Sequence, residues 1–214
     1  MSLSADIDRA RLSVLLDLRH PLAYLALHPA AALAESLAIE VNWLPLVVPT
    51  LKPPSEPRPG DDRGTLHRRH RARAIAREIE TYAAAQDRVL KDYYRGGDVA
   101  AANLAWLWVR DRHAERSLKF LQELFRAYWS LELDASSTEQ VAALVDSVVG
   151  EGSAFQSWST GEGPGAAAAL AAELRERGLF GVPAYVVEDE VFQGRQHLPM
   201  IRWILEGRSG PVPI

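Results

Sequence analysis

The stretch Gly178-Leu179-Phe180-Gly181-Val182-Pro183-Ala184-Tyr185-Val186-Val187 carries the clearest structural signals in the chain. Gly178 is typical of the residue that follows a helix, and it ends an Ala- and Leu-rich segment, 166–177, which we predict to be a helix. The short apolar run 184–187 predicts a buried strand, and 191–193 predicts a second strand that forms a hairpin with it. Residues 198–205 predict a closing helix. This end of the chain is therefore expected to be helix, strand, strand, helix.

The other end of the chain predicts a strand, a helix and a second strand. Leu12–Leu18 is an apolar run typical of a buried strand, and Pro21 stands where a helix begins, because proline is favoured in the first turn. The helix is expected over 23–37, with a kink or break near His28 caused by Pro29. Residues 39–48 predict the second strand.

Between the two ends the sequence is helical. A proline-rich loop begins at Pro49, and a second loop is expected at 161–165. Helical periodicity occupies the segments 65–87, 98–111, 114–131 and 138–149. An aromatic-rich interior is indicated by Asn103, Trp106, Trp108, Phe120, Leu124, Phe125, Tyr128 and Trp129. The predicted fold class is α/β, with a sheet domain divided between 1–48 and 165–214 and an all-helical insertion, 49–164.

Composition excludes several classes of protein. The chain has 214 residues, 48% of them hydrophobic, and no cysteine. It therefore cannot supply a thiol, a disulfide or a Cys-ligated metal. No apolar run approaches the ~20 residues of a membrane span. Met1–Arg11 lacks the apolar region of a signal peptide, so we expect a cytoplasmic protein. A net charge of −4 argues against a general nucleic-acid binder.

Both ends of the chain resemble one family. The segment Asp17-Leu18-Arg19-His20-Pro21-Leu22-Ala23-Tyr24-Leu25-Ala26 resembles the D-F-x-S-P-Y-x-Y-L-A start of the 2-hydroxychromene-2-carboxylate isomerases and kappa-class glutathione transferases. Residues 178–187, with Phe192-Gln193-Gly194 and Leu198, resemble the ending of the same DsbA-like thioredoxin group. The resemblance implies a thioredoxin-like fold, with the helical insertion, and a cis Val182–Pro183 bond whose alternative is a trans proline opening a strand. It also implies that the backbone of Val182 pairs with glutathione as an added strand.

The chain departs from the family at three places. The Ser that contacts the glutathione sulfur in the family is matched by His20. The G-N-x-P-P motif is matched by Thr50-Leu51-Lys52-Pro53-Pro54, so that Leu51 replaces the Asn. The G-x-D-R motif becomes Gly194-Arg195-Gln196-His197, in which Gln196 stands for the acidic residue. By resemblance, Val182, Pro183, Lys52, Arg195 and Gln196 form the ligand-binding set.

His20 is the candidate catalytic residue. A neutral imidazole is expected at a helix N-terminus, because the helix dipole disfavours the imidazolium form. Such a group can donate to a bound thiolate or act as a general base. The alternative is a His that caps backbone amides and has no chemistry. Tyr24 lies one helical turn further on, where it either reaches the same site or packs in the core.

Two other groups of side chains can be interpreted either as a binding site or as ordinary surface residues. Arg69, Arg73 and Arg77 share one helical face, which is either solvated or a clamp for an acidic ligand that faces the sheet domain. His67 and His70 have the spacing of metal ligands, but no acidic third ligand stands beside them, so no metal site is predicted.

The predicted function is a glutathione-dependent isomerase or transferase of the hydroxychromene-carboxylate isomerase type, acting on a small aromatic or acidic compound. The alternative is a non-catalytic thioredoxin-fold binding protein. The expected partners are the small-molecule substrate and, by resemblance, a second copy in a homodimer. No nucleic acid, membrane or metal is expected to bind.

Overall fold

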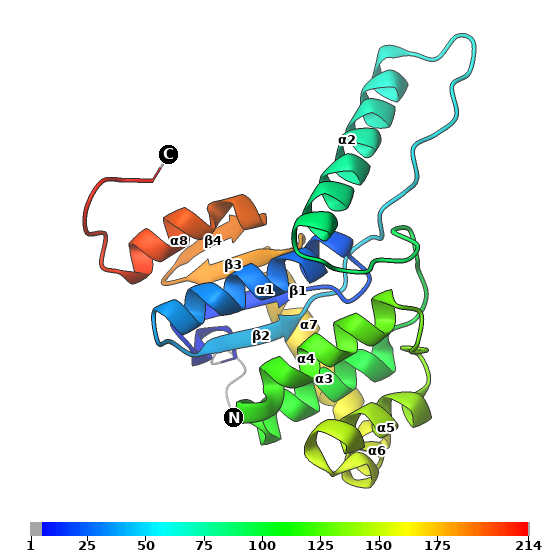
Figure 1. The fold of residues 1–214 in the computed structure, drawn as a ribbon. Helices are drawn as coiled ribbons and strands as arrows, with labels where there is room; N and C mark the ends of the chain where they lie inside the picture. Colours follow the sequence, from blue (N-terminus) through cyan, green and yellow to red (C-terminus); the bar gives the residue numbers. More distant parts are fainter. Residues whose placement is uncertain (1–5, 214) are drawn as a thin grey trace.

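The computed structural model describes residues 6–213 and contains one four-stranded sheet with helices on both faces (Figure 1). Residues 1–5, which include part of the segment tested for a signal peptide, lie outside the described residues. The strands are β1 (Leu12–Leu16), β2 (Val41–Pro45), β3 (Ala184–Val187) and β4 (Glu190–Gln193). Their order in the sheet is β2-β1-β3-β4. β1 runs parallel to β2, and the two later pairings are antiparallel, as expected for a helical crossover followed by a hairpin.

Helices α1 (Pro21–Ser36) and α8 (Leu198–Leu205) cover one face of the sheet, and α7 (Gly163–Glu176) covers the other. The core divides accordingly. Tyr185 of β3 packs with α1 and α8, whereas Leu15 of β1 packs with Leu170 and Leu174 of α7. This is the α/β, thioredoxin-like architecture that the sequence predicted.

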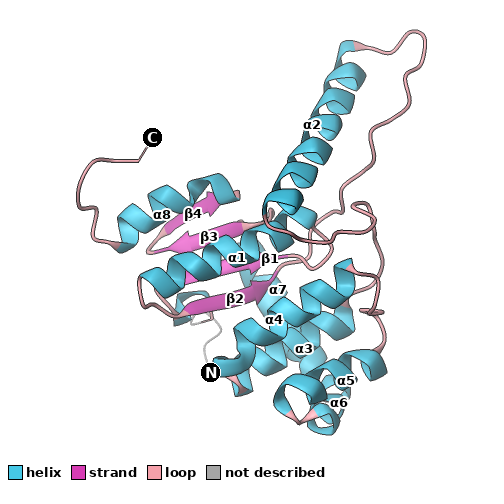
Figure 2. Cartoon of the chain, viewed as in Figure 1, coloured by secondary structure: helices cyan, strands magenta, loops and turns pink. Residues whose placement is uncertain are grey.

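The remaining helices follow β2 in the chain (Figure 2). They are α2 (Arg63–Ala85), α3 (Ala100–Arg112), α4 (Ala114–Trp129), α5 (Thr138–Val149) and α6 (Gly152–Thr160). The predicted aromatic interior is present, since Phe125 contacts both Trp106 and Tyr24 of α1. The core therefore crosses the predicted boundary at 48/49, and the division into segments stays a prediction.

Pro29 does not break α1, so of the two predicted outcomes, a kink or a break, the break is wrong. The helix continues from Pro21 to Ser36 with Pro29 inside it. Proline lacks the N–H that would donate to the carbonyl of Leu25, four residues earlier. The side-chain amide of Gln86, at the end of α2, donates to that carbonyl at 3.0 Å instead. A contact from a distant segment thus supplies the hydrogen bond that the helix itself lacks.

The sequence prediction also missed α6 and misplaced the start of α7. Residues 163–165 belong to α7 rather than to a loop, and Pro164 stands in its first turn, where proline is favoured. Gly163 is required there, because a Cβ would lie 2.9 Å from the ring of Trp158.

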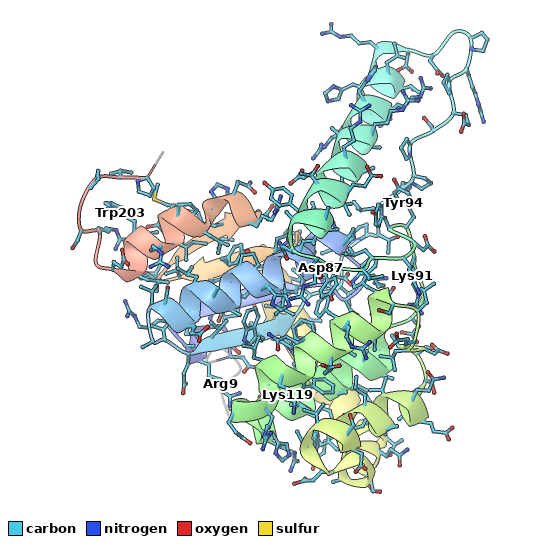
Figure 3. The ribbon with its side chains drawn as sticks, in the orientation of Figure 1. Arg9, Asp87, Lys91, Tyr94, Lys119 and Trp203 are labelled. Carbon is cyan, nitrogen blue, oxygen red and sulfur yellow. The ribbon has the colours of Figure 1, made fainter. Side chains whose placement is uncertain are left out.

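The first half of α2 projects away from the sheet (Figure 1), and its side chains fan outward into solvent (Figure 3). Its second half packs against α1 through Ile79 and Ala83, which contact Leu25. Arg69 is buried, because its guanidinium donates to the carbonyls of Ser55 and Glu56 and pairs with Asp61 in the preceding loop. The prediction that Arg69, Arg73 and Arg77 share a solvated face is therefore wrong for Arg69. The alternative of a clamp for an acidic ligand does not fit Arg69 either, because the preceding loop already binds its guanidinium.

None of the helices within 6–213 is long and apolar enough to cross a membrane.

Candidate functional site

The junction between β1 and α1 positions His20. A turn closes after β1, where the His20 N–H donates to the carbonyl of Asp17 at 3.0 Å. The backbone of His20 is extended, as expected before proline, and Pro21 is the first helical residue. The carbonyl of His20 accepts from Ala23 and Tyr24. These bonds fix His20 at the start of α1, where the sequence placed it.

The imidazole of His20 is not a helix cap. It makes no capping hydrogen bond, and its buried Nδ1 has no partner among the described residues. Burial lowers the pKa of His20, an effect that the nearby Asp17 carboxylate partly opposes. The ring is therefore neutral at pH 7. A neutral imidazole that caps no helix amide can act toward a bound molecule.

Val182 and Pro183 lie at the same end of the sheet as His20. The β1–β3 register pairs Leu15 with Ala184, and its continuation places Pro183 opposite Leu16 and Val182 opposite Asp17. The Val182–Pro183 peptide bond is cis. Neither backbone polar group of Val182 has a hydrogen bond within residues 6–213. A free N–H and a free C=O at a sheet end can pair with an extended ligand.

The two predicted ligand-binding residues that follow β4, Arg195 and Gln196, already bond to groups of the protein. Arg195 pairs with Glu78 of α2 at 3.1 Å and stacks on the ring of Tyr82. The Gln196 amide donates weakly to the carbonyl of Gln193 at 3.3 Å. Gly194, which precedes them, has a φ of 96°, a backbone conformation that favours glycine. The short helix Arg195–His197 contacts α1, but the side chains of Arg195 and Gln196 bond to protein groups.

The last two predicted site residues lie elsewhere. Tyr24 is buried and stacks on Phe125 with ring centroids 5.6 Å apart, so it packs in the core. Lys52 is exposed in the loop between β2 and α2. Neither joins the group formed by His20 and the Val182–Pro183 pair.

Sequence reasoning missed a buried ion pair that supports the site. The carboxylate of Asp17 accepts from Arg19 Nη2 and from the backbone N–H of Val48, each at 2.8 Å. Arg19 also donates to the Val48 carbonyl at 2.8 Å, and its hydrogen bond to Asp17 raises its pKa. The pair joins the end of β1 to the loop after β2. An acidic residue at the end of an apolar strand, followed two positions later by Arg, was the available signal.

A cavity of about 890 Å³ lies beside this ion pair. Its walls come from the loop after β2, from the first half of α3 and from α7, so it lies between the sheet domain and the helices. Arg19 lines it, as does Phe180, which is 64% exposed and stands two residues before Val182. His20 and Val182 are not among the lining residues. The junction therefore borders two separate surfaces.

Two kinds of ligand could occupy such a site, a metal ion or a thiol tripeptide. Within residues 6–213 no cluster of His, Cys, Asp and Glu could bind a metal ion. A thiol tripeptide fits better, since the backbone N–H and C=O of Val182 have no hydrogen-bond partner within residues 6–213. Gln196, which carries no charge, does not fit the role of the acidic group that would meet the ligand's amine.

Comparison with known proteins agrees with this geometry. The chain superimposes on 2-hydroxychromene-2-carboxylate isomerase with a TM-score of 0.67 at 18% identity, covering 92% of this chain and 93% of the other. It also superimposes on the cytosolic disulfide reductase DsbM from Pseudomonas aeruginosa, solved with GSH, with a TM-score of 0.60 at 18% identity, covering 92% and 98%. At these identities the likeness concerns the fold. No curated protein matches the sequence. The DSBA-like thioredoxin domain model matches residues 12–206, and the chain therefore belongs to the DsbA-like thioredoxin family.

Proposed function

We propose that the protein is a glutathione-dependent isomerase or transferase of the hydroxychromene-carboxylate isomerase type, acting on a small aromatic or acidic compound. The observation that carries the proposal is His20, a neutral imidazole at the start of α1 whose Nδ1 has no partner within residues 6–213. The backbone of Val182 would pair with the extended tripeptide, which puts the sulfur near His20. The second substrate would lie in the neighbouring cavity, on the far side of Arg19.

His20 would act on the sulfur as a hydrogen-bond donor. The proposal requires the tautomer in which Nε2 carries the proton of the neutral ring, since this N–H would donate to a thiolate. The N-terminus of α1 favours the same negative charge. The chain has no cysteine, so it cannot form a mixed disulfide and the chemistry cannot be that of a disulfide reductase. The proposal places the protein in the cytoplasm, with a homodimer as its expected assembly.

Calorimetric titration with reduced glutathione at pH 7 tests the proposal. Loss of one hydrogen bond to a charged group costs about 1.5–3 kcal/mol. His20→Ala should therefore weaken binding roughly 10- to 150-fold, and His20→Ser should recover part of the loss. His67→Ala, at an exposed histidine of α2, is the matched control and should bind as the wild type does. Equal binding by the wild type and both His20 variants would contradict the role given to His20.

One observation favours the alternative function. Arg195 is held by Glu78 and Tyr82, and Gln196 replaces an acidic group, so two expected ligand contacts are absent in this conformation. If the wild-type protein binds no glutathione in the titration, a non-catalytic thioredoxin-fold binding protein becomes the better description.

A further inference from the structure

The cavity beside Arg19 is lined almost entirely by aliphatic side chains. Leu104 and Leu107 of α3 and Leu170 and Leu174 of α7 line it, together with the small side chains of Ala167, Ala168 and Ala171 of α7. Phe180 is the one aromatic residue that lines it. The large aromatic rings of the core pack elsewhere, since Trp106, Phe125 and Tyr24 contact one another on the α1 side of the sheet.

The residues that line the cavity indicate the chemical class of the ligand. A flat aromatic molecule gains most where aromatic faces or edges meet it, and this cavity offers one such ring, at an exposed position. An aliphatic chain gains from contact with leucine and alanine walls in proportion to the area that it removes from water. A volume of about 890 Å³ is ample for a chain of a dozen carbons. Val47 and Phe180, which are 60% and 64% exposed, extend the apolar surface to the rim.

The charged groups around the cavity are predominantly positive. Arg175 of α7 lines it and has no ion pair within residues 6–213. Arg19 uses Nε and Nη2 to bond Asp17 and Val48, and its Nη1 has no partner among the same residues. Asp98 is the one acidic lining residue, and its carboxylate already accepts from the Ala100 N–H at the start of α3. The charge of Arg19 is already paired with Asp17, so an anionic head group would find the guanidinium of Arg175 here.

We propose that this cavity binds an unbranched aliphatic monocarboxylate of the fatty-acid type, with its chain between α3 and α7 and its carboxylate at Arg175. The inference rests on the proposed function only in taking this ligand as the second substrate, because its binding requires no glutathione. It replaces an aromatic second substrate by an aliphatic one.

A chain-length series tests the inference on the full-length protein. Octanoate, decanoate and dodecanoate are titrated by calorimetry below their micellar concentrations. Each buried CH₂ contributes about 0.8 kcal/mol, which is roughly fourfold in affinity, so two carbons should add roughly fifteenfold. Dodecanol, which has the chain but not the charge, should bind more weakly than dodecanoate. An affinity that does not change with chain length, or tighter binding of naphthoate than of decanoate, would overturn the inference.

Variants locate the binding. Ala171→Trp and Ala168→Trp place an indole in the cavity from α7 and should abolish dodecanoate binding, whereas Ala172→Trp, at an exposed position of α7 outside the cavity, should not. Arg175→Glu should weaken binding about fivefold or more, and Arg116→Glu, at an exposed position of α4, should leave it unchanged. Equal effects of the cavity variants and their controls would overturn the assignment of the site.

The two proposals fail in distinguishable ways. If dodecanoate binds with these dependences but glutathione does not, the cavity is a lipid-type site and the proposed function fails. If glutathione binds in a His20-dependent manner but the carboxylates do not, the proposed function stands and the inference is wrong.

Discussion

Two neighbouring residues, Arg19 and His20, border two different surfaces, one polar and one apolar. On the His20 side, the available groups are an imidazole and the unpaired backbone of Val182. On the Arg19 side, leucine, valine, proline and alanine side chains line a cavity, with guanidinium groups at its edge. The first surface suits a polar, extended ligand, and the second suits an apolar one.

The difference shows how a single turn can bring two unlike surfaces next to each other. The backbone of residues 17–20 forms one tight turn. The surface beside Arg19 and the surface beside His20 are therefore adjacent. Neither surface depends on the side chains of the other. Each can therefore be altered separately, except through the ion pair that lies between them.

Loss of the Asp17 carboxylate should have the largest effect, because it damages both surfaces. Its side chain is 2% exposed and holds Arg19 and the Val48 N–H. Removing one partner of a buried ion pair costs about 3–5 kcal/mol, since it leaves the other charge unpaired. Asp17→Ala should lower the free energy of unfolding by about that amount in urea titrations. Glu206→Ala, at the exposed pair of Arg202 and Glu206, should cost at most about 1 kcal/mol. A comparable loss in both variants would show that the junction is not held by this pair.

A smaller effect should appear in the pH dependence of stability, and it concerns the His20 side alone. Burial lowers the pKa of His20 in the folded state below its ordinary value of 6.5. As pH falls below 6.5, the unfolded chain takes up a proton that the folded state resists, so unfolding becomes easier. The contribution of one such histidine is at most about 1.4 kcal/mol per pH unit.

His20→Asn should therefore lose stability less steeply than the wild type between pH 6.5 and 5, as measured by thermal unfolding. His28, whose pKa is also lowered by burial, is present in both proteins and cancels in the comparison. Parallel pH profiles would mean that His20 is as free to take up a proton in the folded protein as in the unfolded chain.

The smallest effect should come from releasing Arg195 from α2. Glu78 is 45% exposed, whereas Arg195 is 12% exposed. An ion pair with one partner in solvent is taken to contribute about 0.2–1 kcal/mol, so Glu78→Gln should change glutathione affinity by at most about fivefold. We expect tighter binding, because the freed guanidinium can then turn toward the ligand. Glu80→Gln, at an exposed position of the same helix, is the control. Weaker binding in Glu78→Gln would mean that the contact with α2 holds Arg195 in its useful position.

The elements that the sequence predicted well are those marked by local backbone chemistry. Pro21 begins a helix because its ring is compatible with the first turn, and Gly178 ends one because it adopts a positive φ of 73°. The strands 184–187 and 191–193 follow from apolar runs beside a turn, and the structure confirms them within one residue. His20 at the start of α1 was predicted in the same way.

The failures arise where a distant segment decides the outcome. Pro29 stays within a helix because Gln86 satisfies the Leu25 carbonyl, and no pattern around Pro29 contains that information. Arg69 is buried because the loop before α2 folds back on it. The cavity needs α3 and α7 to face one another, although some fifty residues separate them in the chain. The conformations of side chains at such sites depend on tertiary contacts, which cannot be read from a single sequence.

The projecting half of α2 has a hydrodynamic consequence. A compact chain of 214 residues has a radius of gyration of about 17 Å. The 23 residues of α2 span about 34 Å at 1.5 Å per residue, and their first half stands clear of the body (Figure 1). The projecting half of the helix therefore increases the frictional coefficient of the monomer more than its mass alone would. The monomer should sediment and rotate more slowly than a sphere of equal mass. Its rotational diffusion should be anisotropic, with the long axis determined by α2.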